Sequence, residues 1–270
     1  MQLVLSLFPG IDLLGRAFED EGFFVTRGPD LIFGGDIRRF FPPQGIFHGV
    51  IGGSPCQEFS SLLRTEPTGY GVEMVMEFIR CVQLASPDWF LLENVPRVPS
   101  IEVPGYVIQR FNLAASECGS TQRRLRAYQF GSRNGWPLVI RRASFDGPLS
   151  PAALATEGNK KHRRTWPEFC QLQGLPADYD LPSMKKGEKY RAVGNGVPIP
   201  MGRTIARAIL ARTETRSVRL CLCDCGREVT GNQVMATAAC RKRMERRRRD
   251  CDRPGVSVPG PGTAMATLSR

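Results

Sequence analysis

Short apolar runs alternate along the first half of the chain with segments in which apolar residues recur at helical spacing. The first apolar run covers residues 2–8 and ends at a Pro-Gly pair, and the next segment has one apolar helical face up to Gly22. Further strand-like runs are residues 23–26, 31–33, 49–52, 89–92 and 106–110, the last of which would begin another strand–helix unit, and residues 74–84 have an amphipathic helical pattern. This alternation predicts an α/β fold with a mostly parallel sheet.

Length and composition narrow the class of protein. With 270 residues, 41% of them hydrophobic, the chain is long enough for one or two domains with a full core. There is no stretch of 18 apolar residues, and the opening residues lack the basic segment and cleavage site of a secretory signal, so we expect neither a membrane span nor secretion. The nine cysteines are spread too unevenly for a disulfide scaffold, which favours a reducing, cytoplasmic compartment.

Positive charge is concentrated toward the C-terminal end. The formal net charge is +11, and residues 203–270 carry fifteen Lys and Arg against six Asp and Glu, which leaves only +2 for residues 1–202. Five of the nine cysteines lie between Cys221 and Cys251. A nearly neutral body followed by a basic, arginine-rich tail indicates a nucleic-acid partner, although a solvated basic face is the simpler explanation of such a run.

The opening strand, its glycine turn and the following helix have the layout that binds an adenosine cofactor at the carboxyl end of a sheet. Gly10 would allow close approach of the backbone, and the helix would present free N–H groups. Asp30 lies twenty residues further on, where a carboxylate would meet ribose hydroxyls, and Asp36 would contact an adenine amino group. Each feature alone is more often plain architecture, because a single glycine between a strand and a helix is common.

A second set of residues carries candidate chemistry. Cys56 lies on a loop that leaves a predicted strand, where an exposed thiolate would act as a nucleophile; a buried structural cysteine is the alternative. Glu93 ends another strand and would lie in the same crevice, unless it is a solvated surface carboxylate. Arg124 and Arg126 are alternate residues of a predicted strand and would therefore point the same way.

Seven segments occur in a fixed order within residues 3–210. They read LFPG, GGDI, SPCQEFS, ENV, QRRLR, RRTWPEFCQLQGLP and YRAVGNGVPIPMGRTIARAI. In this order the set resembles the DNA (cytosine-5) methyltransferase family. The resemblance implies an α/β, Rossmann-like methyltransferase sheet and S-adenosylmethionine as the cofactor.

The resemblance also implies how the candidate residues would react with a cytosine flipped out of DNA. Cys56 would attack carbon 6 of the base and form a covalent adduct. Glu93 would hydrogen-bond ring nitrogen 3 and the exocyclic amine. Arg126 would hold oxygen 2, and Arg124 would support the nucleophile loop and a backbone phosphate.

Further site residues follow from the same resemblance. The cofactor residues would be Phe8, Gly10, Ile11, Asp30, Asp36, Ile37, Pro55, Asn195 and Val197. The DNA contacts would be Gln57, Ser60 and Gln122, to which the basic tail adds Arg241, Lys242 and Arg243. Glu168 matches a structural acid of the family, with Arg163 or Arg164 as its partner.

The chain departs from the family pattern in several places. The family's opening reads Asp-Leu-Phe-x-Gly-x-Gly-Gly, whereas this chain has Ser6, Asp12 and Leu13 at the first, seventh and eighth positions. Asp12 sets a carboxylate where a glycine allows close approach, which predicts weaker cofactor binding. Ser54 replaces a proline, a mild change. Only about 36 residues, 127–162, are available for a target-recognition domain, which predicts that sequence specificity is low or is supplied elsewhere, as by the tail.

The tail carries a candidate metal site. Cys221, Cys223, Cys225 and Cys240 resemble a small, treble-clef-like knuckle that ends in a basic helix, and four thiolates would complete a tetrahedral zinc site. Cys251 is a spare ligand, and a disordered basic arm with incidental cysteines is the alternative. In either case the basic run after Cys240 would add salt-dependent affinity for phosphates.

These features together predict a monomeric DNA (cytosine-5) methyltransferase. We expect it in the cytoplasm of a prokaryote, encoded by the cell or by an infecting virus, and bound to the nucleoid through DNA. The predicted parts are a catalytic lobe (1–126), a target-recognition segment (127–162), a return to the lobe (163–212), a zinc knuckle with a basic helix (213–252) and a disordered tail (253–270). Two alternatives stay open: a catalytically weak DNA-binding accessory that works through the tail, and a cytosine methyltransferase that acts on RNA.

Overall fold

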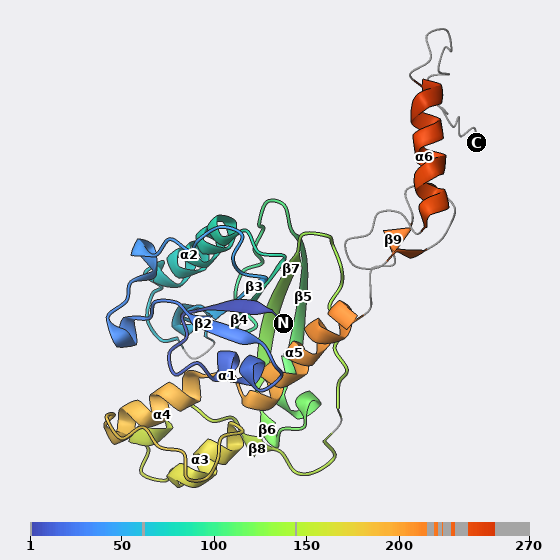
Figure 1. Cartoon of the computed structure of the whole chain (residues 1–270). Helices are drawn as coiled ribbons and strands as arrows, with labels where there is room; N and C mark the ends of the chain where they lie inside the picture. The colour runs from blue at the N-terminus through green and yellow to red at the C-terminus, as the bar shows by residue number, and fades with distance from the viewer. Residues whose placement is uncertain are drawn as a thin grey trace, which may run out of the picture. The chain divides into compact units, whose positions relative to one another are not determined.

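The chain divides into two units, Met1–Glu214 and Thr215–Arg270, and each is described by itself. The structure is a computed structural model that describes residues 2–60, 63–143, 145–214, 219–220, 223, 228–229 and 237–251. Figure 1 shows the first unit as a twisted sheet with helices on both faces.

The first unit is built on a six-stranded sheet with the order β2-β1-β3-β4-β7-β5. The strands are β1 (Leu3–Leu7), β2 (Phe24–Arg27), β3 (Gly49–Gly53), β4 (Trp89–Asn94), β5 (Val107–Ala114) and β7 (Leu125–Ser132). The four strands from β2 to β4 are parallel, whereas β7 runs antiparallel to both of its neighbours. The α/β fold with a mostly parallel sheet is therefore confirmed.

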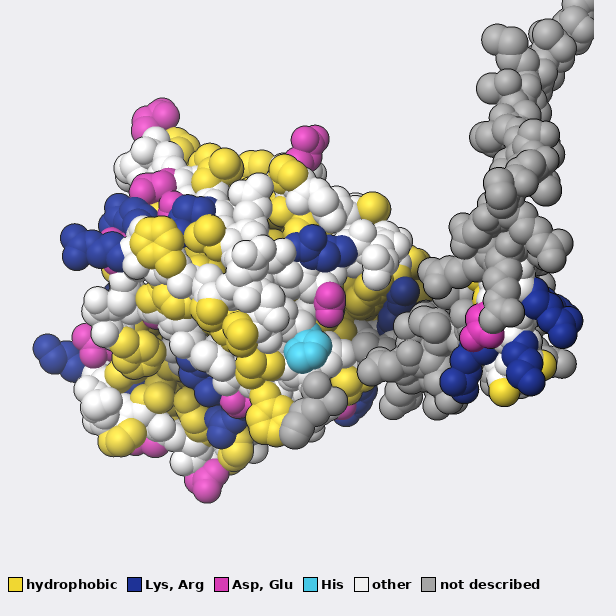
Figure 2. Space-filling model, turned by 45° about the horizontal axis from the view of Figure 1, so that its top comes forward, with side chains coloured by type: hydrophobic (Ala, Val, Ile, Leu, Met, Phe, Trp, Pro, Cys, Tyr) yellow, Lys and Arg dark blue, Asp and Glu magenta, His cyan; other side chains and the backbone are white. Residues whose placement is uncertain are grey.

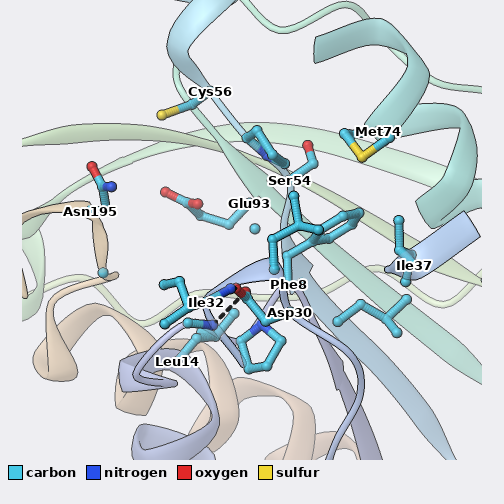
Figure 3. A pocket seen from close by; sticks show the side chains of 18 of the residues that line it. Phe8, Leu14, Asp30, Ile32, Ile37, Ser54, Cys56, Met74, Glu93 and Asn195 are labelled. Carbon is cyan, nitrogen blue, oxygen red and sulfur yellow. Dashed lines mark hydrogen bonds between the residues drawn. The ribbon is translucent and has the colours of Figure 1, made fainter. Parts of the chain in front are cut away.

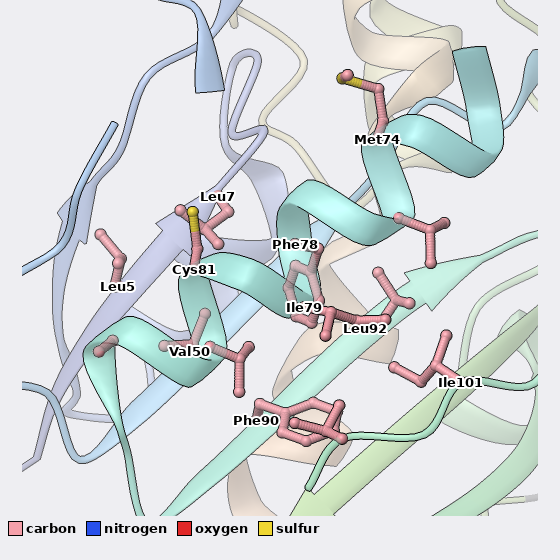
Figure 4. Close-up of a cluster of buried hydrophobic side chains, with 14 of the residues drawn as sticks. Leu5, Leu7, Val50, Met74, Phe78, Ile79, Cys81, Phe90, Leu92 and Ile101 are labelled. Atoms are coloured by element: carbon pink, nitrogen blue, oxygen red, sulfur yellow. The ribbon is translucent and has the colours of Figure 1, made fainter. Parts of the chain in front are cut away.

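Helices bury one face each against the two sides of this sheet. On one side α2 (Tyr70–Ala85) contributes Phe78 and Cys81 to a cluster with Val50 and Phe90 (Figure 4). On the other side α1 (Leu13–Glu19) and α5 (Ile199–Glu214) pack together. Their apolar side chains share a cluster with those of β1 and β7, as the helical spacing of the first segment predicts.

Two strand predictions need correction. Residues Leu31–Phe33 form a 3-10 turn, η1, because Asp30 accepts the N–H of Ile32 and Gly34 ends the turn at a positive φ of 79°. Residues 106–110 do begin a strand, β5, but the chain returns through another 3-10 turn, η4 (Ala115–Cys118), into the antiparallel β7 rather than into a parallel strand–helix unit.

A third apolar cluster lies between α1 and the region after β7. It includes side chains of α3 (Trp166–Leu172) and α4 (Lys186–Asn195). The remaining small elements of the first unit are η2 (Ile37–Arg39), η3 (Gln57–Phe59), β6 (Gln122–Arg123), β8 (Ser150–Pro151) and η5 (Glu157–Asn159), of which η2 and η3 flank the site. Among the described residues between Arg133 and Arg163, β8 and η5 are the regular elements. Little regular structure is thus available there for a separate recognition domain.

The second unit has few described elements. They are the antiparallel pair β9 (Arg219–Leu220) and β10 (Glu228–Val229), and the helix α6 (Ala238–Cys251). Figure 2 shows Lys and Arg side chains gathered on the described part of this unit, whereas basic and acidic side chains are interspersed on the visible face of the first unit. Across the described residues, no helix is both long and apolar enough to cross a bilayer.

Candidate active site

One cavity of about 650 Å³ lies at the carboxyl ends of β1, β3 and β4. All nine predicted cofactor residues line it: Phe8, Gly10, Ile11, Asp30, Asp36, Ile37, Pro55, Asn195 and Val197. Cys56, Glu93, Arg126 and Gln57 line it as well. In Figure 3, Cys56, Glu93 and Asn195 lie toward one end of the cavity and Phe8, Ile37 and Met74 toward the other. The cofactor and nucleophile motifs therefore meet in a single space.

The turn after β1 is held in a left-handed conformation. Phe8, Gly10 and Asp12 have φ values of 53°, 54° and 55°. The N–H of Gly10 donates to Oδ2 of Asp30 at 2.8 Å, which ties this turn to the loop after β2 (dashed in Figure 3). The other oxygen of Asp30 accepts the N–H of Ile32 at 2.9 Å. Strained φ values at two non-glycine residues are typical of functional sites, where the surroundings enforce them.

Asp12 lies between this turn and α1, and its side chain is almost fully buried. Its Oδ1 accepts the hydroxyl of Ser6 at 2.8 Å and the N–H of Gly15 at 3.0 Å, so it is the N-cap of α1. Its Oδ2 lies 2.9 Å from Nε of Arg27. Burial raises the pKa of Asp12, although these partners oppose the shift. Two of the three departures from the family opening, Ser6 and Asp12, thus contact each other.

Asp36 stands at the far end of the cavity with its own partner. It accepts the N–H of Arg38 at 3.0 Å and pairs with the guanidinium of the same residue at 2.8 Å. These hydrogen bonds lower the pKa of Asp36, so its carboxylate is charged at neutral pH. The adjacent Ile37 is buried and supplies an apolar wall.

The nucleophile loop leaves β3 and is fixed from two sides. The side-chain amide of Asn94 donates to the carbonyl and the hydroxyl oxygens of Ser54, at 3.1 and 3.0 Å. On the other side of Cys56, the carboxylate of Glu58 accepts the N–H groups of Thr68 and Gly71, both at 2.7 Å. The sequence motif included Asn94 and Glu58, but gave no sign that they hold the loop.

Glu93 and Arg126 form the charged centre of the site. Oε1 of Glu93 lies 2.9 Å from Nε of Arg126, and both side chains are largely buried. A Cβ at Gly53 would lie 2.9 Å from Oε2 of Glu93, so glycine at this position leaves room for the carboxylate. Burial raises the pKa of Glu93, and Arg126 only partly opposes this.

Cys56 is shielded beside this pair. Burial and the negative charge of Glu93 raise the pKa of the Cys56 thiol, while Arg126 and Arg124 oppose the shift. The isolated protein therefore favours the neutral thiol at pH 7, and a substrate or a proton acceptor is needed to shift the balance toward thiolate.

Three predicted roles need correction because the side chains are used inside the protein. Arg124 precedes β7 and is buried, and it donates to the carbonyls of Ala153, Gly194 and Gly196. It therefore presents no surface for a phosphate, but it lies close enough to Cys56 and Glu93 to oppose the rise in the pKa of each. Its bonds instead fix the segment that closes the cavity.

Gln122 is fully buried and is not a DNA contact. It donates to the carbonyl of Leu172 at 2.6 Å and accepts the N–H of Ala153 at 3.2 Å. Glu168 likewise does not pair with an arginine: it accepts the N–H and hydroxyl of Thr165 and so caps α3.

The remaining predicted contacts lie at the edge of the site or outside it. Arg164 pairs with Glu157 at 2.7 Å rather than with Glu168. Ser60 follows η3 beyond the residues that line the cavity. The basic residues Arg241, Lys242 and Arg243 are exposed on α6, and nothing in the structure tests their binding to DNA.

Two of the four cysteines of the predicted zinc site lie within the described residues. Cys221 and Cys225 lie outside the described residues, whereas Cys223 and Cys240 are both buried. The hydroxyl of Thr237 donates to Sγ of Cys240 at 3.1 Å. Within the described ranges, no group of three His, Cys, Asp or Glu side chains is placed to hold a metal ion.

Comparison with known structures concerns the fold. The methyltransferase EhMeth of Entamoeba histolytica superposes with a TM-score of 0.60 at 12% identity, covering 79% of this chain and 99% of that one. A putative DNA modification methyltransferase encoded within an E. coli prophage gives a TM-score of 0.52 at 18% identity, covering 79% of this chain and all of the other. The predicted methyltransferase sheet is confirmed.

Sequence comparison identifies the family. Type II methyltransferase M.XorII of Xanthomonas oryzae is 24% identical over 223 residues, which are 66% of this chain and 51% of that protein. Type II methyltransferase M.HgiDI of Herpetosiphon aurantiacus is 31% identical over 96 residues, about a third of each chain. The chain thus spans about a third to a half of the length of these relatives. The model of the C-5 cytosine-specific DNA methylase family matches residues 35–149 and 154–211, more than half of the chain, so the chain belongs to that family.

Proposed function

We propose that this protein transfers a methyl group from S-adenosylmethionine to carbon 5 of a cytosine flipped out of DNA. The observation that carries the proposal is the convergence of Cys56, Glu93 and Arg126 in the cavity that the cofactor turn also lines. Family membership supports the substrate and the reaction class. Because the names of the bacterial relatives describe type II methyltransferases, a role beside a restriction enzyme is part of the proposal.

The cavity fits a cofactor that carries an adenosine. Its volume of about 650 Å³ lies within the range of small-molecule sites, about 300–1,000 Å³. Phe8, Ile37 and Met74 provide apolar walls. Asp30 and Asp36 are held by backbone N–H groups, and each carboxylate oxygen keeps acceptor capacity for ribose hydroxyls or an amino group. Bound there, S-adenosylmethionine would supply an electrophilic methyl group.

The chain's own residues would then prepare the base for methylation. Sγ of Cys56 would bond to carbon 6, and the electron pair of the ring double bond would move toward carbon 5. Glu93, whose pKa is raised by burial, would donate a proton to nitrogen 3 as negative charge develops in the ring. Arg126 would hold both Glu93 and oxygen 2 of the base. Once carbon 5 has taken the methyl group, a water molecule would accept the carbon 5 proton and the ring double bond would re-form. The bond to Cys56 would then break to restore the thiolate, and nitrogen 3 would return its proton to Glu93.

The decisive experiment follows methylation and covalent capture together. Duplex DNA with 5-fluorocytosine cannot lose a proton from carbon 5, so the protein and cofactor should yield a denaturation-resistant complex with it. Cys56→Ala should form none, while Cys118→Ala, which alters a cysteine outside the cavity, should behave like the parent. Bisulfite sequencing of DNA from expressing cells would report the target sites, and dispersed methylated cytosines would match a recognition segment limited to residues 127–162.

Two results would replace this proposal with the alternatives. A protein that binds duplex DNA tightly but does not bind S-adenosylmethionine in calorimetry would be a DNA-binding accessory. A protein that methylates tRNA in preference to duplex DNA in a competition would be an RNA methyltransferase.

We also propose that the second unit holds a structural zinc ion through Cys221, Cys223, Cys225 and Cys240. The burial of Cys223 and Cys240 in a unit whose described helix is strongly basic supports this, because a bound metal ion stabilises small domains that have a limited apolar core. Elemental analysis of the purified chain should find about one zinc per molecule, and Cys240→Ser should lose it. An equal metal content in parent and variant would contradict the proposal.

A further inference from the structure

A second hollow, of about 620 Å³, lies outside the active site. We call it the basic hollow. It is formed by the residues that precede α3 together with the first turns of α4, and five of its nine lining side chains are Lys161, Arg163, Arg164, Lys186 and Lys189. None of the lining residues is acidic. A concave surface lined by one sign of charge concentrates ions of the opposite sign.

Most of this charge is not neutralised by the protein. Arg164 pairs with Glu157, and Lys189 pairs with Asp180. Lys161 and Lys186 have no carboxylate within 4.0 Å among the described residues, and both are exposed. The basic hollow therefore retains an excess of positive charge that an anion from outside would neutralise.

The floor of the basic hollow is rigid rather than a set of mobile side chains. The indole N–H of Trp166 donates to the carbonyl of Tyr179 at 2.7 Å, and the hydroxyl of Tyr190 donates to the carbonyl of Arg164 at 2.8 Å. The rings of Trp166 and Tyr190 contact edge to face with centroids 5.2 Å apart. These contacts fix the backbone segments from which the cations project, so phosphate binding would need to order only the lysine and arginine side chains themselves.

Helix α4 connects the basic hollow with the active site. Lys186 and Lys189 line the basic hollow, whereas Arg191 and Asn195 of the same helix line the cavity that contains Cys56. With a rise of about 1.5 Å per residue, nine residues from Lys186 to Asn195 span about 14 Å. This equals roughly four base-pair steps of about 3.4 Å each, so phosphates a few nucleotides from a base in the cavity are within reach.

We propose that the basic hollow binds backbone phosphates of the DNA duplex beside the flipped cytosine. The location of the DNA in this inference rests on the proposed function. Phosphate contacts carry no sequence information, but they fix the register and orientation of a protein on the duplex. A chain with so short a recognition segment gains in this way an anchor within its catalytic unit, in addition to the basic tail.

The test compares two double variants of the full chain. Lys161→Ala/Lys186→Ala removes two cations from the basic hollow. Arg203→Ala/Arg207→Ala removes two cations from α5 that pair with Asp20 and Glu21, at the end of α1 remote from the cavity. Fluorescence anisotropy with a labelled duplex should show about tenfold weaker binding at low salt, and a salt slope reduced by about 1 to 2, for the first variant alone. Lys161→Arg/Lys186→Arg should restore both.

Equal affinities and salt slopes in the two double variants would overturn the inference, provided that thermal unfolding shows both to be folded. A loss of affinity for single-stranded RNA without a loss for duplex DNA would overturn it as well. Because this assay needs neither cofactor nor turnover, its outcome is separate from that of methylation. A parent that binds duplex through these lysines but transfers no methyl group would refute the proposed function and retain the anchor.

Discussion

The two ends of the cavity differ in how firmly their ionisable groups are held by partners within the chain. At the cofactor end, both oxygens of Asp12 and Asp30 have partners within the protein, and Asp36 is paired with its neighbour, Arg38. At the nucleophile end, burial raises the pKa values of Cys56 and Glu93. The carboxylates of the cofactor end are thus oriented in advance by partners within the chain, whereas the nucleophile end holds two groups that can exchange protons with a substrate.

This difference follows from what each end must do. A binding surface gains affinity when its groups are already oriented, because little entropy is then lost on binding. A group that gives and takes protons must instead have a pKa near the working pH, and burial shifts a carboxylate upward toward it. Substitutions at the nucleophile end should therefore affect rate, and substitutions at the cofactor end should affect stability and cofactor affinity.

The largest effect is expected for Glu93→Gln. The amide keeps the size of the side chain but cannot transfer a proton to nitrogen 3, so methyl transfer should slow by about 100-fold or more. The rate should be measured in a single turnover with DNA and cofactor in excess, with the binding constants of both determined alongside. Glu102→Gln, which changes an exposed glutamate outside the cavity, is the matched control. A variant that keeps its rate but loses DNA affinity would contradict the assigned role.

A smaller effect is expected on the ionisation of Cys56 itself. The charge of Glu93 raises the pKa of this thiol, so Glu93→Gln should lower the pKa and move the rise of alkylation rate with pH to lower pH. Arg126→Gln should move it to higher pH, because a stabilising positive charge is removed. Alkylation of the Cys56 peptide by iodoacetamide, followed by mass spectrometry, measures both shifts.

Cys118 serves as the internal control for this experiment. Burial raises its pKa to about 11, and neither Glu93 nor Arg126 is among the groups that influence it. Its alkylation profile should be the same in all three proteins. Identical profiles for Cys56 in parent and Glu93→Gln would show that the two groups do not interact.

The same comparison explains which parts of the site the sequence could predict. The cofactor and nucleophile residues follow directly on strand ends, so local motifs sufficed to bring Gly10, Cys56 and Glu93 to one edge of the sheet. The buried positions of the Gln122 and Arg124 side chains were not predictable in this way. Their partners lie 29 to 72 residues away in the sequence, and a short polar run does not show whether its side chains meet solvent or buried carbonyl groups.

The two errors in the predicted secondary structure and topology have a similar origin. Leu31–Phe33 is apolar and suits a strand, yet Asp30 and Gly34 close it into a turn whose apolar side chains stay exposed. The apolar pattern of β5 predicted a strand but did not indicate whether it pairs parallel or antiparallel with its neighbour. Side chains alternate in the same way in both kinds of pair.

The smallest effect is expected for substitutions at positions 6 and 12, which restore the residues of the family opening at these two positions. Ser6→Asp would set two carboxylates side by side and should lower the free energy of unfolding by about 1–2 kcal/mol. Asp12→Gly removes the N-cap of α1 but relieves a strained φ, so it should cost only about a few tenths of a kcal/mol. The double variant restores the family pattern with one carboxylate, and its glycine suits the φ of 55° at residue 12. Urea unfolding should therefore give a double variant closer to the parent than the sum of the single changes, with a coupling of about 1–2 kcal/mol.

The pH dependence of Ser6→Asp separates charge repulsion from a simple packing defect. Repulsion raises the carboxyl pKa in the folded state above that in the unfolded state, so the folded protein binds the extra proton more tightly. The stability deficit of Ser6→Asp relative to the parent should then shrink as the pH falls from about 8 toward 5. A deficit that is constant over this range would mean that the carboxylates do not interact, and that the pairing of Ser6 with Asp12 does not explain why both positions depart from the family together.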